Sequence, residues 1–180
     1  ALERMMHRGA IAADGKSALS AGHHLRDEPD GGLQLWDLAS GKITRTLSGN
    51  GSPVYKLGLS ADGRSLAATT ANGEKLMLWD LASGRELRTL VGNSQVVFSP
   101  DSKVLATSDK DRHLLLFDVA SGRQMHAIAG HPAGASDIAF STNGSVIAAG
   151  SVDHSVKLWD VRSGSEKRSF PGSDKPIDSI

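Results

Sequence analysis

Four residues in the last third of the chain have the types that nucleophilic catalysis uses. His131, Ser151 and Asp153 are followed by the tryptophan Trp159. A serine hydroxyl becomes a nucleophile when a histidine takes its proton and an aspartate orients that histidine. The same groups also suit a structural hydrogen-bond network, in which each buried polar atom finds a partner. The residues alone therefore permit two interpretations, one catalytic and one structural.

A second set of residues, near the N-terminus, has the side chains of a metal site. His23 and His24 are followed by three carboxylates, Asp27, Glu28 and Asp30. Imidazole and carboxylate groups are ordinary zinc ligands. The segment 23–32 is also charged and contains proline and glycine, which is typical of a surface loop. We expect a loop here, with no bound metal, and no cofactor motif stands elsewhere in the chain.

The composition narrows the class of protein. Lysine and arginine total 20 and aspartate and glutamate total 20, so the formal charge is zero and nucleic acid is not an expected partner. Cysteine is absent, which excludes disulfides and thiolate zinc sites. No apolar run approaches the roughly 18 residues of a membrane span, and no signal-peptide pattern opens the chain. These features predict a cytoplasmic protein without membrane partners.

The elements that must position these residues come from an internal repeat. One phrase occurs four times, as LQLWDLASGK (33–42), LMLWDLASGR (76–85), LLLFDVASGR (114–123) and VKLWDVRSGS (156–165). A second phrase precedes it each time, as AADGKSALSAG (12–22), SADGRSLAATT (60–70), SPDSKVLATSD (99–109) and STNGSVIAAGS (141–151). Two phrases in a fixed order indicate one supersecondary unit used four times.

Each unit is predicted to contain four short antiparallel strands. Asp14-Gly15, Asp62-Gly63 and Asn143-Gly144 are signals for a tight hairpin between the first two strands, and Asp101-Ser102 is a weaker version. The third strand alternates with a period of two and carries the aromatic residue. The fourth strand is the most polar, as suits an edge strand.

The repeated WD dipeptide resembles the WD40 family over nearly the whole chain. The resemblance implies an all-β fold of β-propeller blades, with about seven or eight blades in a closed ring. We expect four complete four-stranded blades over 8–48, 49–91, 92–129 and 130–170, in a single propeller segment spanning 1–180. Residues 1–7 are expected to form the outer strand of a preceding blade, and 171–180 the start of a following one. The chain is then a segment of a larger ring, or a half-ring that pairs with a second copy.

The resemblance also implies roles for the residues named first. In this family a loop histidine, a serine or threonine, an aspartate and the strand-three tryptophan commonly form a hydrogen-bond network. His131, Ser151, Asp153 and Trp159 match that pattern in the fourth unit, which favours the structural interpretation over catalysis. In the third unit Phe117 replaces the tryptophan, so its ring has no N–H to donate.

Differences between the units indicate where partners could bind. The first unit has extra residues in 23–32, and the third has four fewer residues around 92–98. The candidate partner-binding residues lie in the enlarged loop 23–32 and in the loops at 50–56 and 108–113, on the same face: His23, His24, Arg26, Asp27, Tyr55, Lys110, Arg112 and His113. The expected function is a non-catalytic scaffold that binds other proteins or peptides. The alternative is a regulatory or sensing module of a larger protein, such as a bacterial kinase-like or caspase-like chain, whose catalytic domain lies elsewhere.

Overall fold

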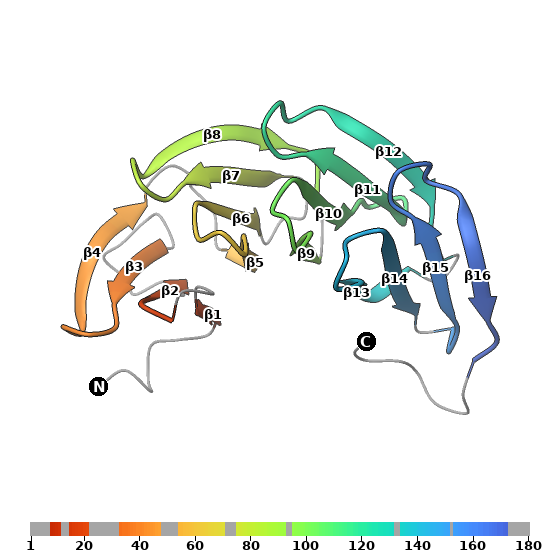
Figure 1. Ribbon diagram of the computed structural model, residues 1–180, viewed down its shortest axis with the longest axis horizontal. Helices are drawn as coiled ribbons and strands as arrows, with labels where there is room; N and C mark the ends of the chain where they lie inside the picture. Colours follow the sequence, from red (N-terminus) through yellow and green to blue (C-terminus); the bar gives the residue numbers. More distant parts are fainter. Residues whose placement is uncertain are drawn as a thin grey trace. The chain divides into compact units, whose positions relative to one another are not determined.

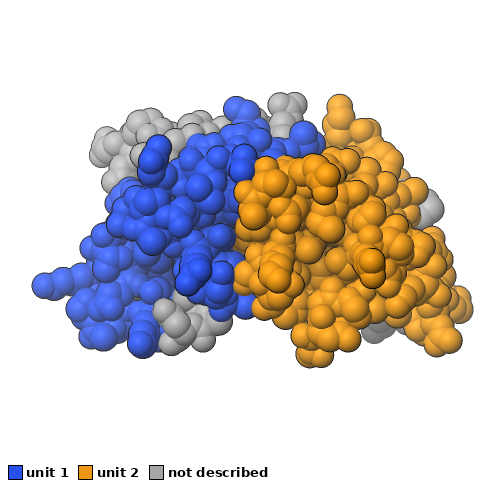
Figure 2. All heavy atoms as spheres, turned by 45° about the horizontal axis from the view of Figure 1, so that its top comes forward, with its two compact units in different colours: residues 1–91 blue, residues 92–180 orange. Residues whose placement is uncertain are grey.

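The computed structural model describes residues 8–11, 15–21, 33–47, 54–70, 75–92, 95–131, 134–151 and 153–172. Sixteen strands and no helix are found in these segments (Figure 1). The described residues accordingly include no helix long and apolar enough to cross a membrane. The chain divides into two compact units, residues 1–91 and 92–180 (Figure 2).

The first unit contains two four-stranded antiparallel sheets, each ordered as the chain runs. Blade one consists of β1 (Arg8–Ile11), β2 (Ser17–Ala21), β3 (Leu33–Asp37) and β4 (Lys42–Leu47). Blade two consists of β5 (Val54–Leu59), β6 (Ser65–Thr70), β7 (Leu76–Asp80) and β8 (Arg85–Leu90).

The second unit repeats the same arrangement. Blade three consists of β9 (Val96–Phe98), β10 (Val104–Ser108), β11 (His113–Asp118) and β12 (Gln124–Ala129). Blade four consists of β13 (Ala135–Phe140), β14 (Val146–Ser151), β15 (Val156–Asp160) and β16 (Glu166–Phe170). The all-β class and the four-stranded antiparallel blades are therefore as the sequence predicts. The strands predicted within 1–7 and 173–180 lie outside the described residues.

The apolar core of each unit lies between its two blades. In the first unit Leu19 and Leu33 of blade one pack with Trp79 and Leu81 of blade two. In the second unit Leu114 and Leu116 of blade three pack with Ile147, Trp159 and Val161 of blade four. Burying one such side chain stabilises the packed pair of blades by about 1.5–3 kcal/mol. Trp79 of blade two and Trp159 of blade four therefore lie on the side of their blade that packs against the preceding blade.

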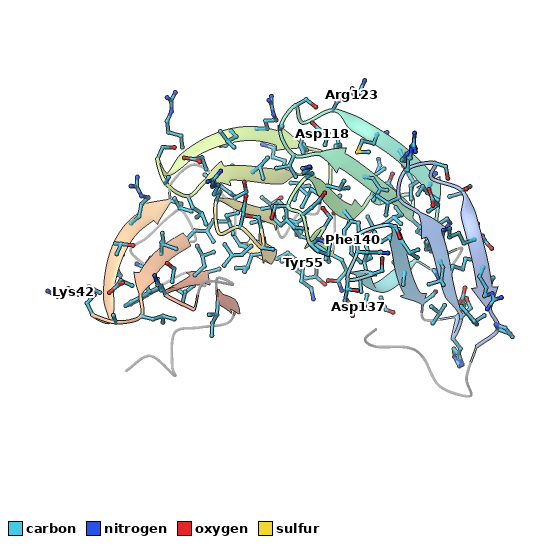
Figure 3. All side chains as sticks on the ribbon, viewed as in Figure 1. Lys42, Tyr55, Asp118, Arg123, Asp137 and Phe140 are labelled. Atoms are coloured by element: carbon cyan, nitrogen blue, oxygen red, sulfur yellow. The ribbon has the colours of Figure 1, made fainter. Side chains whose placement is uncertain are left out.

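The turns between strands three and four explain the repeated Asp and Gly of the WD phrase. The aspartate Oδ1 accepts a hydrogen bond from the backbone N–H of the serine three residues on, at 2.7 Å in Asp37–Ser40 and Asp80–Ser83. The same bond is 2.8 Å in Asp118–Ser121, near the labels of Asp118 and Arg123 in Figure 3. The glycine that follows has a positive φ in every blade, between 64° and 71°, which only glycine adopts without strain.

The third unit of the sequence has four fewer residues around 92–98, and the first strand of blade three is correspondingly short. β9 has three residues, whereas β5 and β13 have six each. The fourth strand is at the edge of every sheet, and it is mostly exposed in β4, β8 and β16, whereas β12 is partly buried. The deletion is thus found at the innermost strand, while β10 to β12 keep their ordinary lengths.

Candidate functional site

His131 lies at the centre of a polar network in blade four. It precedes β13, its residue is 1 % exposed, and its Nε2 lies 2.8 Å from the backbone oxygen of Ala149 in β14. A carbonyl oxygen can only accept a hydrogen bond, so Nε2 carries the proton. The Nδ1 atom lies 3.1 Å from the hydroxyl of Ser155, just before β15. Both ring nitrogens are therefore occupied by atoms of the same blade.

The other residues predicted for this network lie around the imidazole. Asp153 Oδ2 is 3.7 Å from His131 Nδ1, and Ser151 Oγ accepts a 3.2 Å hydrogen bond from the backbone N–H of Asp153. The ring of Trp159 meets the imidazole edge to face, with centroids 5.9 Å apart. A hydrogen bond from the Ser155 hydroxyl, with a smaller effect of the imidazole, lowers the pKa of Asp153 below its ordinary value.

This geometry differs from that of a Ser-His-Asp triad. In a triad the imidazole bonds the nucleophile through one nitrogen and the aspartate through the other. Here Ser155 and Asp153 both lie on the Nδ1 side, while Nε2 is bonded to a backbone carbonyl. The Ser155 hydroxyl also lies 2.6 Å from Asp153 Oδ1. The arrangement satisfies buried polar groups and offers His131 no free nitrogen for a substrate.

Ser155 was not among the residues predicted from the sequence, although it bonds both His131 and Asp153. Serine is common in turns, so its identity alone carries little signal. The signal was its place two residues after Asp153, where Asp153 Oδ1 also accepts the Ser155 backbone N–H at 3.0 Å. An aspartate that bonds the residue two positions on is an Asx turn, which fixes the hydroxyl under the imidazole.

The candidate partner-binding residues fall into two groups. His23, His24, Arg26 and Asp27 lie outside the described residues. Tyr55 is on β5 and is 41 % exposed (Figure 3). Lys110 and Arg112 are exposed in the turn between β10 and β11, and Arg112 has a φ of +69°. His113, the first residue of β11, is half-buried.

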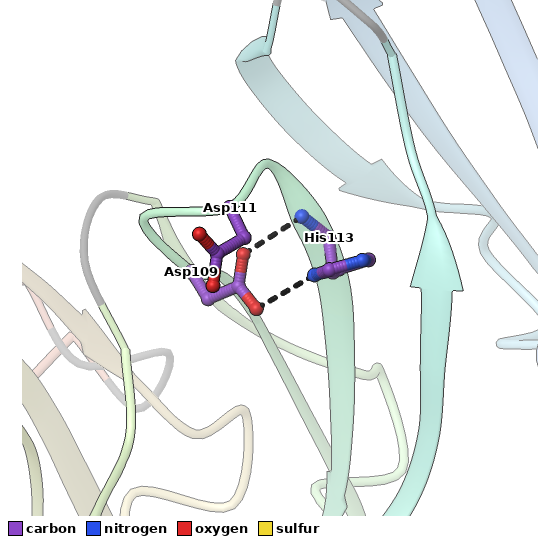
Figure 4. A group of neighbouring side chains, drawn as sticks. All are labelled: Asp109, Asp111 and His113. Atoms are coloured by element: carbon purple, nitrogen blue, oxygen red, sulfur yellow. Dashed lines mark hydrogen bonds and ion pairs between the residues drawn. The ribbon is translucent and has the colours of Figure 1, made fainter.

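The same turn brings together three side chains that could hold a cation. Asp109, Asp111 and His113 each offer one ligand atom, and these atoms lie within 4.8 Å of one another (Figure 4). Asp109 also accepts two hydrogen bonds from His113, one from the backbone N–H at 2.8 Å and one from Nδ1 at 2.9 Å. A cation bound at His113 Nδ1 would have to displace the second of these hydrogen bonds.

The position of these three residues in the repeat is a sequence signal for the group. Asp109, Asp111 and His113 take the places that Ser151, Asp153 and Ser155 hold in blade four. In both turns the residue before the third position has a positive φ, +69° at Arg112 and +74° at His154. The turn is shared, but a carboxylate and an imidazole replace two hydroxyls. The two turns therefore share a backbone conformation and differ in the side chains at the first and third positions.

Comparison with protein families decides the class of these blades. The family model described as WD domain, G-beta repeat matches residues 41–80, 84–118 and 122–160. These segments cover more than half of the chain. The chain belongs to the WD40 family. Comparison with curated proteins gives no match.

Each WD40 match begins in or beside a turn between strands three and four and ends on strand three of the next blade. The first match, for example, runs from Gly41 through β4 to the end of β7. A WD40 sequence repeat therefore joins the outer strand of one blade to the inner strands of the following blade.

Proposed function

We propose that this chain is a non-catalytic scaffold that binds other proteins or peptides. WD40 repeats generally mediate protein–protein interaction. The observation that carries the proposal is the engagement of His131, the best catalytic candidate, with Ala149 and Ser155 of its own blade. A histidine that is 1 % exposed and bonded at both nitrogens supports the blade and leaves recognition to exposed side chains.

The exposed turn between β10 and β11 is the part of the proposed docking surface that the structure describes best. Lys110 and Arg112 are exposed in this turn, and Asp109 accepts two hydrogen bonds from His113 at its base. A rigid base lowers the entropy lost when a partner immobilises the turn. Tyr55 contributes a second proposed contact, because an exposed tyrosine offers both an apolar ring and a hydroxyl.

Selection of binding peptides from a displayed random library tests this function. We expect the wild-type chain to select a defined set of peptides, and the double substitution Lys110→Glu with Arg112→Glu to weaken their binding at least about tenfold, equal to 1.4 kcal/mol. Arg123→Glu, in the exposed turn after Asp118, is the control for one such reversal of charge. Peptides that bind the turn variant and the wild type equally would reject this surface. Failure to select any peptide would reject the scaffold function.

Self-association that completes the propeller belongs to the same proposal. The support for it is that Leu38 of blade one is 46 % exposed, whereas the equivalent Leu81 of blade two is 5 % exposed.

A further inference from the structure

The first hairpin of blade four contains the dipeptide Asn143-Gly144, at the position where blades two and three have an aspartate. Asn143 is exposed in the turn between β13 and β14. Asparagine is a thermolabile residue, and its side-chain amide is attacked most readily when glycine follows, because the next residue then has no side chain to hinder the approach. The turn therefore carries a group that can change chemically without an enzyme.

Three hydrogen bonds hold the side-chain oxygen of Asn143. Its Oδ1 accepts from the Ser141 hydroxyl at 2.8 Å, from the Ser145 backbone N–H at 3.0 Å and from the Ser145 hydroxyl at 2.8 Å. The Ser141 hydroxyl oxygen itself accepts the backbone N–H of Val146 at 3.0 Å. The Asn143 side chain thus connects the two arms of the hairpin at its tip.

Blades two and three build the same turn around a carboxylate. In blade three, Asp101 Oδ1 accepts hydrogen bonds from the Ser99 hydroxyl at 2.6 Å and from the Lys103 backbone N–H at 3.1 Å. The equivalent two hydrogen bonds of blade two are 2.6 Å and 3.0 Å long. The hydrogen bond from Ser99, with a further one from the N–H of Lys103, lowers the pKa of Asp101 below its ordinary value. The turn therefore favours a charged acceptor at this position.

We infer that Asn143 is a modification site, where spontaneous deamidation converts the first hairpin of blade four to the carboxylate form that blades two and three already have. The conversion adds one negative charge to a chain whose formal charge is zero. It is independent of the scaffold function proposed above, because it rests on this hairpin alone.

The reaction consumes only water. The backbone nitrogen of Gly144 bonds to Cγ of Asn143, the bond from Cγ to the side-chain nitrogen breaks, and that nitrogen leaves as ammonia with the proton of the Gly144 N–H. One water molecule then opens the resulting succinimide ring. Opening at Cγ gives aspartate, whereas opening at the backbone carbonyl carbon gives isoaspartate, whose main chain runs through Cγ.

The closed turn restrains the first step of this reaction. The Gly144 N–H is donated to the backbone oxygen of Ser141 at 2.8 Å, so the attacking nitrogen is already engaged. The Asn143 oxygen is held by the three hydrogen bonds described above. Attack on Cγ therefore requires the turn to open, and the reaction rate follows the fraction of molecules in which this hairpin is open.

Of the two products, aspartate is the one that fits the closed turn. It keeps the backbone and the Oδ1 acceptor, so it can accept from Ser141 and Ser145 as Asp101 accepts from Ser99 and Lys103. Isoaspartate places an extra carbon in the main chain before Gly144, where the hydrogen bond to Ser141 closes the turn. We therefore expect the aspartyl protein to keep the stability of the wild type and the isoaspartyl protein to lose stability.

Peptide mapping by mass spectrometry tests the site. The tryptic peptide 124–157 contains Asn143 as its one asparagine, and deamidation raises its mass by one unit. During incubation in mildly alkaline buffer we expect this peptide to convert in the folded protein at least about tenfold more slowly than in the same chain in urea, since only the open fraction reacts. Asn143→Gln, which would have to form a larger ring, is the chemical control and is expected to stay unmodified.

Asn143→Asp supplies the aspartyl product directly, and its melting temperature at neutral pH is expected to equal or exceed that of the wild type. Thr142→Asp is the matched control, because it puts the same charge on the adjacent exposed residue. An Asn143→Asp protein that melts below both the wild type and Thr142→Asp would overturn the inference. A folded wild type that gains no mass in peptide 124–157, while the chain in urea is converted, would overturn it as well. Equal rates in the folded protein and in urea would contradict the control of the reaction by the turn.

Discussion

The three strand-three tryptophans share a position but not their hydrogen bonds. Trp36 Nε1 donates to Ser20 Oγ at 2.8 Å, whereas the buried Nε1 of Trp79 has no partner in the part of the chain that is described. Trp36 pairs with Ala18, and Ser20 lies two residues further along β2. Trp79 pairs with Leu66, and the residue two further along β6 is Ala68. A methyl group therefore stands where blade one has a hydroxyl.

Replacing Ala68 with serine is expected to stabilise the protein. The new hydroxyl can accept the Trp79 N–H, and a net gain of about 1 kcal/mol is typical of one internal hydrogen bond. Thermal unfolding should then shift to a higher temperature. Ala67→Ser is the matched control, because Ala67 is also buried but its side chain points to the opposite face. A variant Ala68→Ser that is no more stable than Ala67→Ser would contradict this explanation.

Replacing His131 with alanine is expected to lower the free energy of unfolding by about 2–4 kcal/mol. The change removes the bonds to Ala149 and Ser155 and leaves a cavity beside Trp159. Chemical denaturation measures the loss. His113→Ala, at a half-buried imidazole, is the control and should cost less than half as much. An unchanged stability of His131→Ala would remove the structural role.

The sequence was enough to identify most residues of the network around His131, but not the hydrogen bonds that they form. His131, Asp153 and Trp159 stand in a recognisable pattern, but the role of Ser155 depends on a turn that places its hydroxyl 3.1 Å from the imidazole. The unpaired N–H of Trp79 likewise depends on strand register. Register and turn geometry decide which polar atoms meet, and neither is written in residue type alone.

Among the elements, the turns between strands three and four have a pH dependence that can be measured. Backbone and side-chain hydrogen bonds from Ser163, with a further bond from Lys167, lower the pKa of Asp160 to about 2. Hydrogen bonds from Ser40 and Ser83 lower the pKa of Asp37 and Asp80 in the same way. A carboxylate whose pKa is lower in the folded state stabilises that state above its unfolded pKa, which is about 4.

This stabilisation is expected to disappear as the pH falls from about 4 to about 2. The denaturation midpoint should therefore fall between pH 5 and pH 2.5, and the fall should be smaller in Asp160→Asn, which cannot titrate. Asparagine keeps the Oδ1 acceptor, so the two proteins remain comparable at low pH. Identical pH profiles for the wild type and Asp160→Asn would show that this turn does not contribute.

The order and type of the elements followed directly from the sequence. The Asp-Gly and Asn-Gly hairpins are present, with positive φ at Gly15, Gly63 and Gly144. Ser102 takes the same turn with a φ of +62°, although it is not glycine. The repeat enforces the turn there, since the strands on either side pair as in the other blades. The turn preference of Asp101-Ser102 is weak by itself, and the pairing of the strands on either side therefore determines the turn.

At the scale of the whole molecule, the contacts between blades were not predictable from the sequence. Arg45 donates hydrogen bonds to backbone oxygens 37 and 38 residues away. Residue types do not indicate which backbone atoms a side chain will bind. The equivalence of the Arg45 and His126 contacts is found only by comparing blades with equivalent strand registers. The same comparison shows that Leu38 and Phe170 are exposed where their counterparts are buried.

The mass of the wild-type protein in solution tests this account most directly. Light scattering over a series of protein concentrations is expected to show twice the single-chain mass of 18.9 kDa, with dissociation on dilution. A protein that stays at 18.9 kDa at every concentration would contradict the account.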